Sequence, residues 1–303
     1  MFILELEIDM RDYLSINTID STIDCRSRLI ERVCDAVQAK EFSVAFQPIL
    51  DVQSRIVVGT EALLRWQHPE FGQLLPGTFA KALLAPEAAW ATTAFVINEV
   101  CRQLSSMLEN PSNSNQKVIG DLQFVSFNVF PSQLRGTRLS SLIREALIKH
   151  RVSSSFIIVE LLECEPISDH ESLQQDIERL RDMGVRVAID DFGSGLWTLS
   201  DLANLNIDIV KLSGKLVRRG PMDAKAWLIL SSMIDLLSDI GVTTVVEGIE
   251  SEEVHSWIEE QRPVMVQGYG YSRPQPCLHS AVFIEDRIQK IARTSACEVT
   301  LIE

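Results

Sequence analysis

The sequence predicts an α/β protein in which strands and helices alternate along one large domain. Eight strand-like apolar runs occur, and patterns with apolar residues every three or four positions lie between most of them. The predicted strands span residues 42–50, 56–66, 123–130, 156–162, 185–189, 207–212, 243–246 and 263–271. This count and this alternation match a (β/α)8 barrel, the TIM-barrel fold.

One connection differs from that of a regular barrel. Only residues 51–55 separate the first two predicted strands, which is too short for a helix. These two strands are therefore expected to pair as an antiparallel hairpin. The predicted fold class is α/β, a modified TIM (β/α)8 barrel with an antiparallel second strand.

Helical spacing of apolar residues predicts helices over residues 26–41, 168–183, 198–205 and 224–240. The first 25 residues are acidic and weakly patterned, so we expect residues 1–25 to be an N-terminal extension. The barrel domain is expected to span residues 26–282, and residues 283–303 a C-terminal helix or tail. Residues 110–120 form a polar loop.

Composition excludes several classes of function. The net charge of −14 argues against binding of DNA or RNA polymers, which requires a basic surface. The six cysteines are scattered without paired spacing, which indicates reduced thiols rather than disulfides or a zinc site. No apolar run is long enough to span a membrane, and no cationic leader is present. A cytoplasmic protein is expected.

Two adjacent carboxylates end the fifth predicted strand. Asp190 and Asp191 follow a short apolar run and precede a loop that contains Gly193. Neighbouring carboxylates repel each other and resist desolvation unless a cation neutralises them. The pair therefore predicts a cation site.

Other polar residues lie near the ends of the remaining strands. They are Glu61, Asn128, Glu160, Glu163, Lys211, Glu247, Glu250 and Gln267. In a barrel these ends converge on the face that carries the active site. Oxygen ligands without histidine or thiolate suit Mg²⁺ or Mn²⁺, and a bridging aspartate suits two ions. Two such ions and a lysine predict metal-assisted hydrolysis of a phosphate ester.

Each of these residues taken alone has a simpler interpretation. A single glutamate at a strand end, such as Glu61 or Glu250, is usually a solvated terminus. Asn128 alone is more often a turn or cap residue, and Lys211 could be a surface lysine or the partner of Asp208. The combined pattern is what favours a site.

The chain resembles the EAL-domain family of bacterial cyclic di-GMP phosphodiesterases. The family is named for the triplet Glu61-Ala62-Leu63, and the resemblance rests on separated motifs over nearly all of residues 42–276. They are FQPIL (46–50), EALLRW (61–66), FNV (127–129), VELLE (159–163), AIDDFGSG (188–195), DIVKL (208–212), VVEGIE (245–250) and QGYGYSRPQP (267–276).

The resemblance implies a role for each matching residue. The two divalent cations, Mg²⁺ or Mn²⁺, are expected on Glu61, Asn128, Glu160, Asp190, Asp191 and Glu247, with Asp190 bridging. Lys211 is expected to contact the hydrolytic water, with support from Glu250 and Gln267. Glu163 is expected to anchor the loop after the aspartates, and Gln47 and Arg65 to contact the dinucleotide.

The resemblance also implies a reaction and partners. The family opens cyclic di-GMP to the linear dinucleotide pGpG, and a homodimer through the helix after the aspartate loop is expected. A regulatory protein partner, of unknown identity, is a further expectation. Four features depart from the family pattern: Ser213 replaces an aspartate, Leu196-Trp197-Thr198 replaces Tyr-Ser-Ser, Phe130 replaces a serine, and the segment after Phe79 lacks an acidic turn. They leave open an alternative, a catalytically weak domain that acts as a cyclic di-GMP receptor or a protein-binding regulator.

Overall fold

A computed structural model describes residues 19–109, 121–167, 169–194, 196–220 and 223–283, with the backbone alone for residues 19–27. Most of the predicted N-terminal extension, the predicted loop over 110–120 and nearly all of the predicted C-terminal tail lie outside the described residues. Within the described ranges, no helix is long and apolar enough to cross a membrane.

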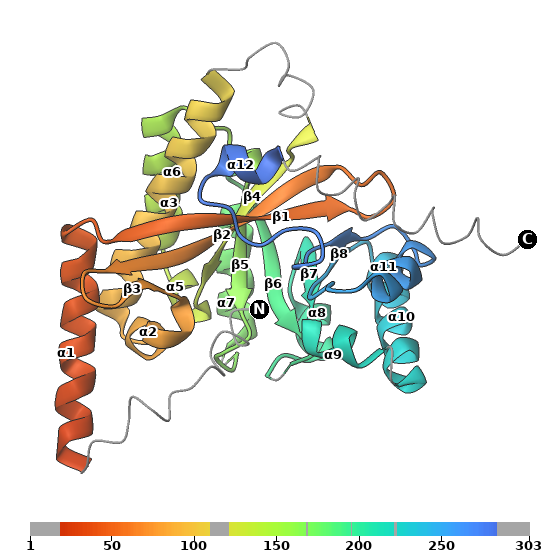
Figure 1. The fold of residues 1–303 in the computed structure, drawn as a ribbon, viewed down its shortest axis with the longest axis horizontal. Coiled ribbons are helices and arrows are strands. Elements are labelled where there is room, and N and C mark those ends of the chain that lie inside the picture. Colours follow the sequence, from red (N-terminus) through yellow and green to blue (C-terminus); the bar gives the residue numbers. More distant parts are fainter. Residues whose placement is uncertain (1–18, 110–120, 168, 195, 221–222, 284–303) are drawn as a thin grey trace, which may run out of the picture.

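Strands form a closed barrel with helices on its outside (Figure 1), which confirms the predicted fold class. The order around the barrel is β1-β9-β8-β7-β6-β5-β4-β2, and β1 pairs with β2 to close it. The barrel strands are β1 (Phe42–Asp51), β2 (Val57–His68), β4 (Phe124–Val129), β5 (Ile157–Leu162), β6 (Arg186–Phe192), β7 (Ile209–Leu212), β8 (Thr243–Val246) and β9 (Met265–Val266). The short strand β3 (Gly72–Leu74) extends β2 at its far end.

The reversed strand is the first one rather than the second. β1 runs antiparallel to both of its neighbours, β2 and β9, whereas β2 is parallel to β4. The short connection after β1 requires a hairpin, and the long helical crossover that follows β2 fixes the direction of β2 to that of the later strands. The predicted hairpin is confirmed, and the detail of which strand is reversed is corrected.

β9 forms the shortest pairings in the barrel, with two register pairs to β1 and two to β8. Only Leu50↔Val266 and Asp51↔Met265 are register partners between β1 and β9, whereas β1 pairs with β2 from Phe42↔Trp66 to Leu50↔Val57. Beyond β9, one isolated antiparallel bridge joins Phe46 to Gln275. The predicted eighth strand over 263–271 is thus much shorter in the structure.

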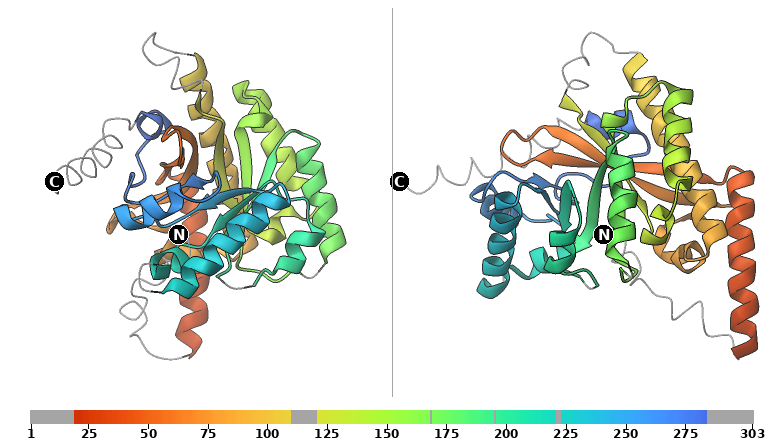
Figure 2. Two further views of the ribbon diagram at one scale, coloured as in Figure 1. Left: turned by 90° about the vertical axis from the view of Figure 1, so that its right-hand side faces the viewer. Right: turned by 180° about the vertical axis from the view of Figure 1, so that it is seen from behind.

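Helices cover the outside of the barrel. The long helix α1 (Ile19–Gln38) begins before the predicted residue 26 and lies at one end of the molecule, against α2 and α3 (Figure 2). The other helices are α2 (Pro76–Leu83), α3 (Pro86–Glu109), α5 (Pro131–Leu134), α6 (Arg138–His150), α7 (His170–Arg181), α8 (Leu199–Asn204), α9 (Gly214–Arg219), α10 (Ala224–Asp239), α11 (Glu252–Glu259) and α12 (Leu278–Val282), with a 3₁₀ turn at Ser154–Phe156.

Side-chain caps define where several of these helices begin. Asp169 accepts a hydrogen bond from the backbone N–H of Ser172 at the start of α7, and Ser251 accepts one from Val254 at the start of α11. Such caps satisfy backbone donors that have no partner within the helix. The crossovers therefore begin at defined points after the strand ends, where the polar residues lie.

An apolar plug fills the barrel interior near the amino ends of the parallel strands. It consists of Ile49, Phe124, Ile158, Ala188, Ile209 and Val245. Gly59 on β2 makes room for the largest of them, because a Cβ at this glycine would lie 2.2 Å from the Phe124 ring. This end of the barrel is a packed core and leaves the opposite end for a site.

Gly59→Ala is expected to destabilise the protein by about 1–3 kcal/mol, because the added methyl group overpacks the plug. Urea unfolding of the full chain measures the loss. Phe124→Leu is the matched second change: in the double variant the smaller side chain should recover part of the stability. Equal stability of Gly59→Ala and the parent would contradict the packing described here.

Candidate active site

Four buried carboxylates surround one buried ammonium at the carboxyl ends of the strands. Lys211 Nζ, on β7, lies 3.0 Å from Glu61 Oε2 and 3.0 Å from Glu160 Oε2. The same nitrogen lies 2.8 Å from Asp190 Oδ1 and 2.9 Å from Glu247 Oε1. Lys211 is 1% exposed, so water does not screen these contacts appreciably. The structure brings together residues that are up to 186 positions apart in the sequence, Glu61 and Glu247.

Two amide side chains fix the orientation of Glu61. Asn128 on β4 donates from Nδ2 to Glu61 Oε1 over 2.8 Å, and Gln267 donates from Nε2 to Glu61 Oε2 over 2.8 Å. Both carboxylate oxygens of Glu61 thus have donors. The remaining carbonyl oxygens, Asn128 Oδ1 and Gln267 Oε1, are buried and have no hydrogen-bond partner among the described residues.

The charges in this cluster are unbalanced, and the pKa values reflect it. Burial raises the pKa of Glu160 well above its usual value, although Lys211 opposes the shift. Burial also raises the pKa of Asp190, to about 6, with Glu247 and Glu61 adding to the effect. The pKa of Glu247 is lowered: burial opposes this shift, and the contact with Lys211 favours it. One ammonium does not neutralise four carboxylates, so the cluster attracts protons or further cations.

Lys211 itself is held in its charged form. Burial lowers the pKa of Lys211, but its four acidic neighbours raise it more, and the net direction is well upward. In this state the lysine is a donor and a positive charge, not a base. Its pKa must fall whenever the carboxylates around it are neutralised by another cation.

The donor set suits hard divalent cations, although its oxygens are not arranged in the coordination geometry of a bound ion. Carboxylate and amide oxygens are the ligands that Mg²⁺ and Mn²⁺ prefer. Asp191 Oδ1 and Asn128 Oδ1 are buried oxygens without a hydrogen-bond partner in the described part of the chain, as expected of ligands that await an ion. Among all residues that the structure describes, no three histidine, cysteine or acidic side chains stand in metal-holding geometry. At this cluster, the ammonium of Lys211 lies between the carboxylates.

A backbone irregularity presents Asp191. The β6–β7 register shifts between Ile189 and Phe192, and Asp191 has a left-handed φ of 55°. A non-glycine residue in that region carries strain of about 1–3 kcal/mol that its surroundings must offset. Because of this bulge both aspartates are buried, Asp190 at 2% and Asp191 at 3% exposed, instead of alternating between the two faces of the strand.

Glu163 holds the loop that follows the two aspartates. Its Oε2 accepts hydrogen bonds from the backbone N–H and the hydroxyl of Ser194, at 3.2 and 3.1 Å. Its Oε1 accepts one from the backbone N–H of Trp197 at 2.6 Å. These are the contacts that an anchor of this loop requires.

The remaining predicted site residues lie beside the cluster or at its rim. Gln47 on β1 is the register partner of Glu61, is fully buried and donates to the Ser272 carbonyl at 3.3 Å. Arg65 is buried and donates to the Leu64 carbonyl. Glu250 is exposed, with Arg218 3.9 Å away, so the structure does not bring it into the Lys211 cluster.

Sequence reasoning missed Ser126. Its buried hydroxyl donates to the Thr60 carbonyl at 3.4 Å and partly opposes the rise of the Glu160 pKa. Ser126 lies on β4 two residues before Asn128 and two after Phe124, so the alternation along the strand places all three on the inner face. This alternation of every second residue could have identified Ser126 from the sequence.

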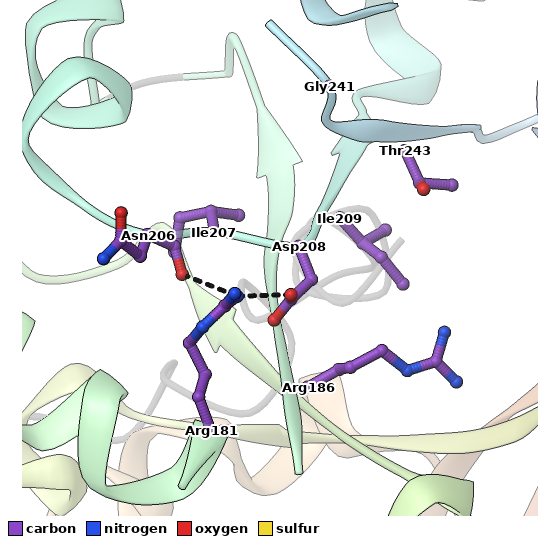
Figure 3. Close-up of a pocket in the computed structure, with 8 residues that line it drawn as sticks. All are labelled: Arg181, Arg186, Asn206, Ile207, Asp208, Ile209, Gly241 and Thr243. Atoms are coloured by element: carbon purple, nitrogen blue, oxygen red, sulfur yellow. Dashed lines mark hydrogen bonds and ion pairs between the residues drawn. The ribbon is translucent and has the colours of Figure 1, made fainter. Parts of the chain in front are cut away.

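A cavity of about 320 Å³ lies at the other end of the barrel and is not this site (Figure 3). It is lined by the amino ends of β6, β7 and β8, including Arg186, Ile209 and Thr243. Its charged groups have protein partners: Arg181 contacts Asp208 and the Asn206 carbonyl, and Arg186 donates to the carbonyls of Gln123 and Ser155. These contacts tie strand beginnings to neighbouring loops, and we interpret them as structural.

Comparison with known proteins agrees with this fold. The family model described as the EAL domain matches residues 30–274. The chain therefore belongs to the EAL-domain family.

Several relatives match over most of the chain. An uncharacterised protein of Mycobacterium tuberculosis is 30% identical over 245 residues, which cover 80% of this chain and 78% of that protein. The probable cyclic di-GMP phosphodiesterase PdeN of Escherichia coli is 27% identical over 251 residues, 83% of this chain and 47% of PdeN. The chain spans only 42% of the length of another mycobacterial relative, also uncharacterised.

Solved structures of EAL domains share the fold. The PaMucR phosphodiesterase in complex with c-di-GMP superposes with a TM-score of 0.74 at 26% identity, covering 82% of this chain and 98% of that one. The EAL enzyme Bd1971 with cAMP and cyclic di-GMP bound gives a TM-score of 0.78 at 25% identity, covering 89% and 70%.

Stability of the metal-free protein is expected to fall as the pH rises from about 4 to about 6. The folded pKa of Asp190, about 6, lies above the value of about 3.9 for an unfolded chain, so the folded state binds the proton more tightly. The stabilisation is complete below pH 4 and is lost as the pH rises through 6, by on the order of 3 kcal/mol. Urea unfolding with a chelator at each pH measures it.

Asp190→Asn provides the comparison, because the amide does not titrate. The difference in free energy of unfolding between Asp190→Asn and the parent should change across pH 4–6 and stay constant above about pH 7. Glu247 contributes in the opposite sense and at lower pH, because its pKa is lowered. Parallel pH profiles of Asp190→Asn and the parent would rule out the raised pKa.

Proposed function

We propose that this protein is a metal-dependent phosphodiesterase that hydrolyses cyclic di-GMP to linear pGpG. The observation that carries the proposal is the convergence of Glu61, Glu160, Asp190 and Glu247 on Lys211 at the carboxyl end of the barrel. Membership of the EAL-domain family supports it, as do relatives whose names record cyclic di-GMP hydrolysis or binding.

Six side chains would hold two divalent cations, Mg²⁺ or Mn²⁺. They are Glu61, Asn128, Glu160, Asp190, Asp191 and Glu247. When bound, the ions would supply positive charge that polarises the scissile phosphate and lowers the pKa of a water, so that the water can lose a proton and attack the phosphorus. Buried oxygens without hydrogen bonds at Asn128 and Asp191 support this assignment.

Lys211 would act next to the ions through its charge and its donors. It enters the reaction as an ammonium, since its carboxylate neighbours raise its pKa. An ammonium in a site this buried stabilises negative charge that develops on the phosphoryl oxygens and orients the attacking water by hydrogen bonding. Gln267 supports it indirectly by fixing Glu61. Glu250 would join only after moving from the rim, where it faces Arg218.

The substrate would bind at the same end of the barrel. Gln47 has a buried oxygen, Oε1, without a hydrogen bond among described residues, which a guanine or ribose donor could satisfy. Arg65 would offer its guanidinium to a phosphate. The substrate carries its own negative charge, so it would enter this acidic site only together with the cations.

A second copy of the chain is the expected partner. Exposed apolar side chains on α8 and α10 support a homodimer: Leu199, Leu228, Ile229, Leu236 and Ile240. A regulatory protein partner and a cytoplasmic location remain predictions from the sequence.

Glu61→Ala is expected to lower pGpG production by more than about 100-fold, because removal of a ligand should cost more than removal of a residue that only supports one. The assay incubates the purified full chain with Mn²⁺ and cyclic di-GMP and separates the products by chromatography. The fold should persist, since the change removes one of several clustered negative charges.

Glu99→Ala is the matched control, because this glutamate pairs with Arg102 on the remote helix α3. It should leave turnover unchanged. Turnover of Glu61→Ala equal to that of the parent would refute the metal site. A parent chain that binds cyclic di-GMP without releasing pGpG would favour the receptor alternative.

Ser213→Asp is expected to raise turnover. Ser213 is buried beside the end of β7 and caps α9 by accepting from the Lys215 backbone N–H, a role that aspartate also fills. The new carboxylate would restore the negative charge that the family carries two residues after Lys211. Turnover at fixed Mn²⁺ and cyclic di-GMP gives the result, and Ser213→Asn controls for size. Equal rates for all three proteins would show that this departure is neutral.

A further inference from the structure

Among the described residues from Gly193 to Leu199, Trp197 is the one large apolar side chain that is buried. Leu196 is 51% exposed and Leu199 is 55% exposed, whereas Trp197 between them is 4% exposed and packs in the main core. An indole buries more surface than any other side chain, so its placement fixes the backbone around it. The position of Trp197 is therefore a strong local constraint on this loop.

The Trp197 side chain connects the loop to two other strand ends. Its indole N–H donates to the Glu165 carbonyl at 3.1 Å, three residues after the end of β5. The Glu165 carboxylate accepts hydrogen bonds from the backbone N–H and hydroxyl of Ser132, at 2.8 and 3.1 Å. Ser132 follows β4, which carries Asn128, and β5 carries Glu160. A chain of contacts thus links the aspartate loop to the segments behind two proposed ligands.

A histidine–aspartate pair holds the start of the following helix. Asp201 on α8 accepts from the backbone N–H and hydroxyl of Thr198 at 2.6 and 2.8 Å through Oδ2. Its Oδ1 lies 2.5 Å from His170 Nε2 on α7. The pair therefore ties Thr198, the residue next to Trp197, to a different helix of the barrel.

The loop needs such support because of its own backbone. Asp191 at φ 55° and Gly193 at φ 90° both lie in the left-handed region, and the Glu163 carboxylate accepts hydrogen bonds from Ser194 and from the Trp197 backbone. A conformation of this kind persists only when its surroundings over-determine it. The indole contact and the His170–Asp201 pair supply constraints beyond those of Glu163.

We propose that Trp197 and the His170–Asp201 pair are positioning residues, which hold Asp191 ready for a divalent cation and so set the affinity of the site for it. The inference rests on the proposed function, because Asp191 is a ligand only if the site binds metal. Contacts of this type, one step removed from a ligand, typically change metal affinity by about 10-fold to 100-fold.

The experiment titrates Mn²⁺ into the metal-free full chain by calorimetry and records thermal unfolding in chelator. Trp197→Phe keeps an aromatic ring in the core and removes only the indole donor; Trp197→Ala removes both. We expect the Mn²⁺ dissociation constant to rise about 10-fold for the first and up to about 100-fold for the second. Trp90→Phe is the matched control, since Trp90 lies on α3 and stacks with Arg138; it should bind Mn²⁺ as the parent does.

His170→Ala is an independent test, because this side chain is 41% exposed and its removal leaves no cavity in the core. It should weaken Mn²⁺ binding about 10-fold with little change in the unfolding temperature. Parent-like Mn²⁺ affinity in both Trp197→Phe and His170→Ala would overturn the proposal while leaving the proposed function intact. A parent chain that binds no Mn²⁺ would overturn both.

Discussion

The structure depends on a buried ammonium placed among four buried carboxylates. A charge removed from water costs several kcal/mol, and the cost is recovered only when opposite charges and hydrogen bonds compensate closely. Lys211 is compensated several times over, whereas the carboxylates are not. The excess negative charge explains why the pKa values of Glu160 and Asp190 rise and why the cluster has a capacity for more cations. A barrel without a cation to bind would gain stability by losing these residues.

The barrel makes this arrangement sustainable because it fixes each side chain from a different strand. Glu61 is held by donors from β4 and from the segment after β9, and a bulge in β6 turns both aspartates inward. The apolar plug beneath, with Phe124 against Gly59, prevents the strands from closing on the charges. Rigid packing at one end of the barrel thus supports an electrostatically unfavourable arrangement at the other.

Sequence patterns predicted the barrel, the hairpin and most strand positions, because burial enforces them locally. They failed where long-range contacts decide. The last predicted strand shortens to Met265–Val266, since Gly268 lies so close to the Ile249 backbone that the chain turns there. The sequence also allowed Lys211 to be the partner of Asp208, but Asp208 lies just before β7 and pairs with Arg181 near the opposite end of the barrel. The convergence of these polar residues, Lys211 included, on one end of the barrel could be inferred; the direct contact of the ammonium with four carboxylates could not.

The short pairings of β9 have a consequence for motion. β9 has only two register pairs with β1 and two with β8, so the barrel wall has the fewest backbone pairs on both sides of β9, beside Gln267. The isolated Phe46–Gln275 bridge is the next pairing along β1. Local opening begins where few backbone bonds must break. Amide protons of β9 and of the β1 residues that face it should exchange with solvent sooner than those of β4, β5 and β6. Local opening of the barrel would then occur at β9, next to the polar cluster, while the other strands stay paired.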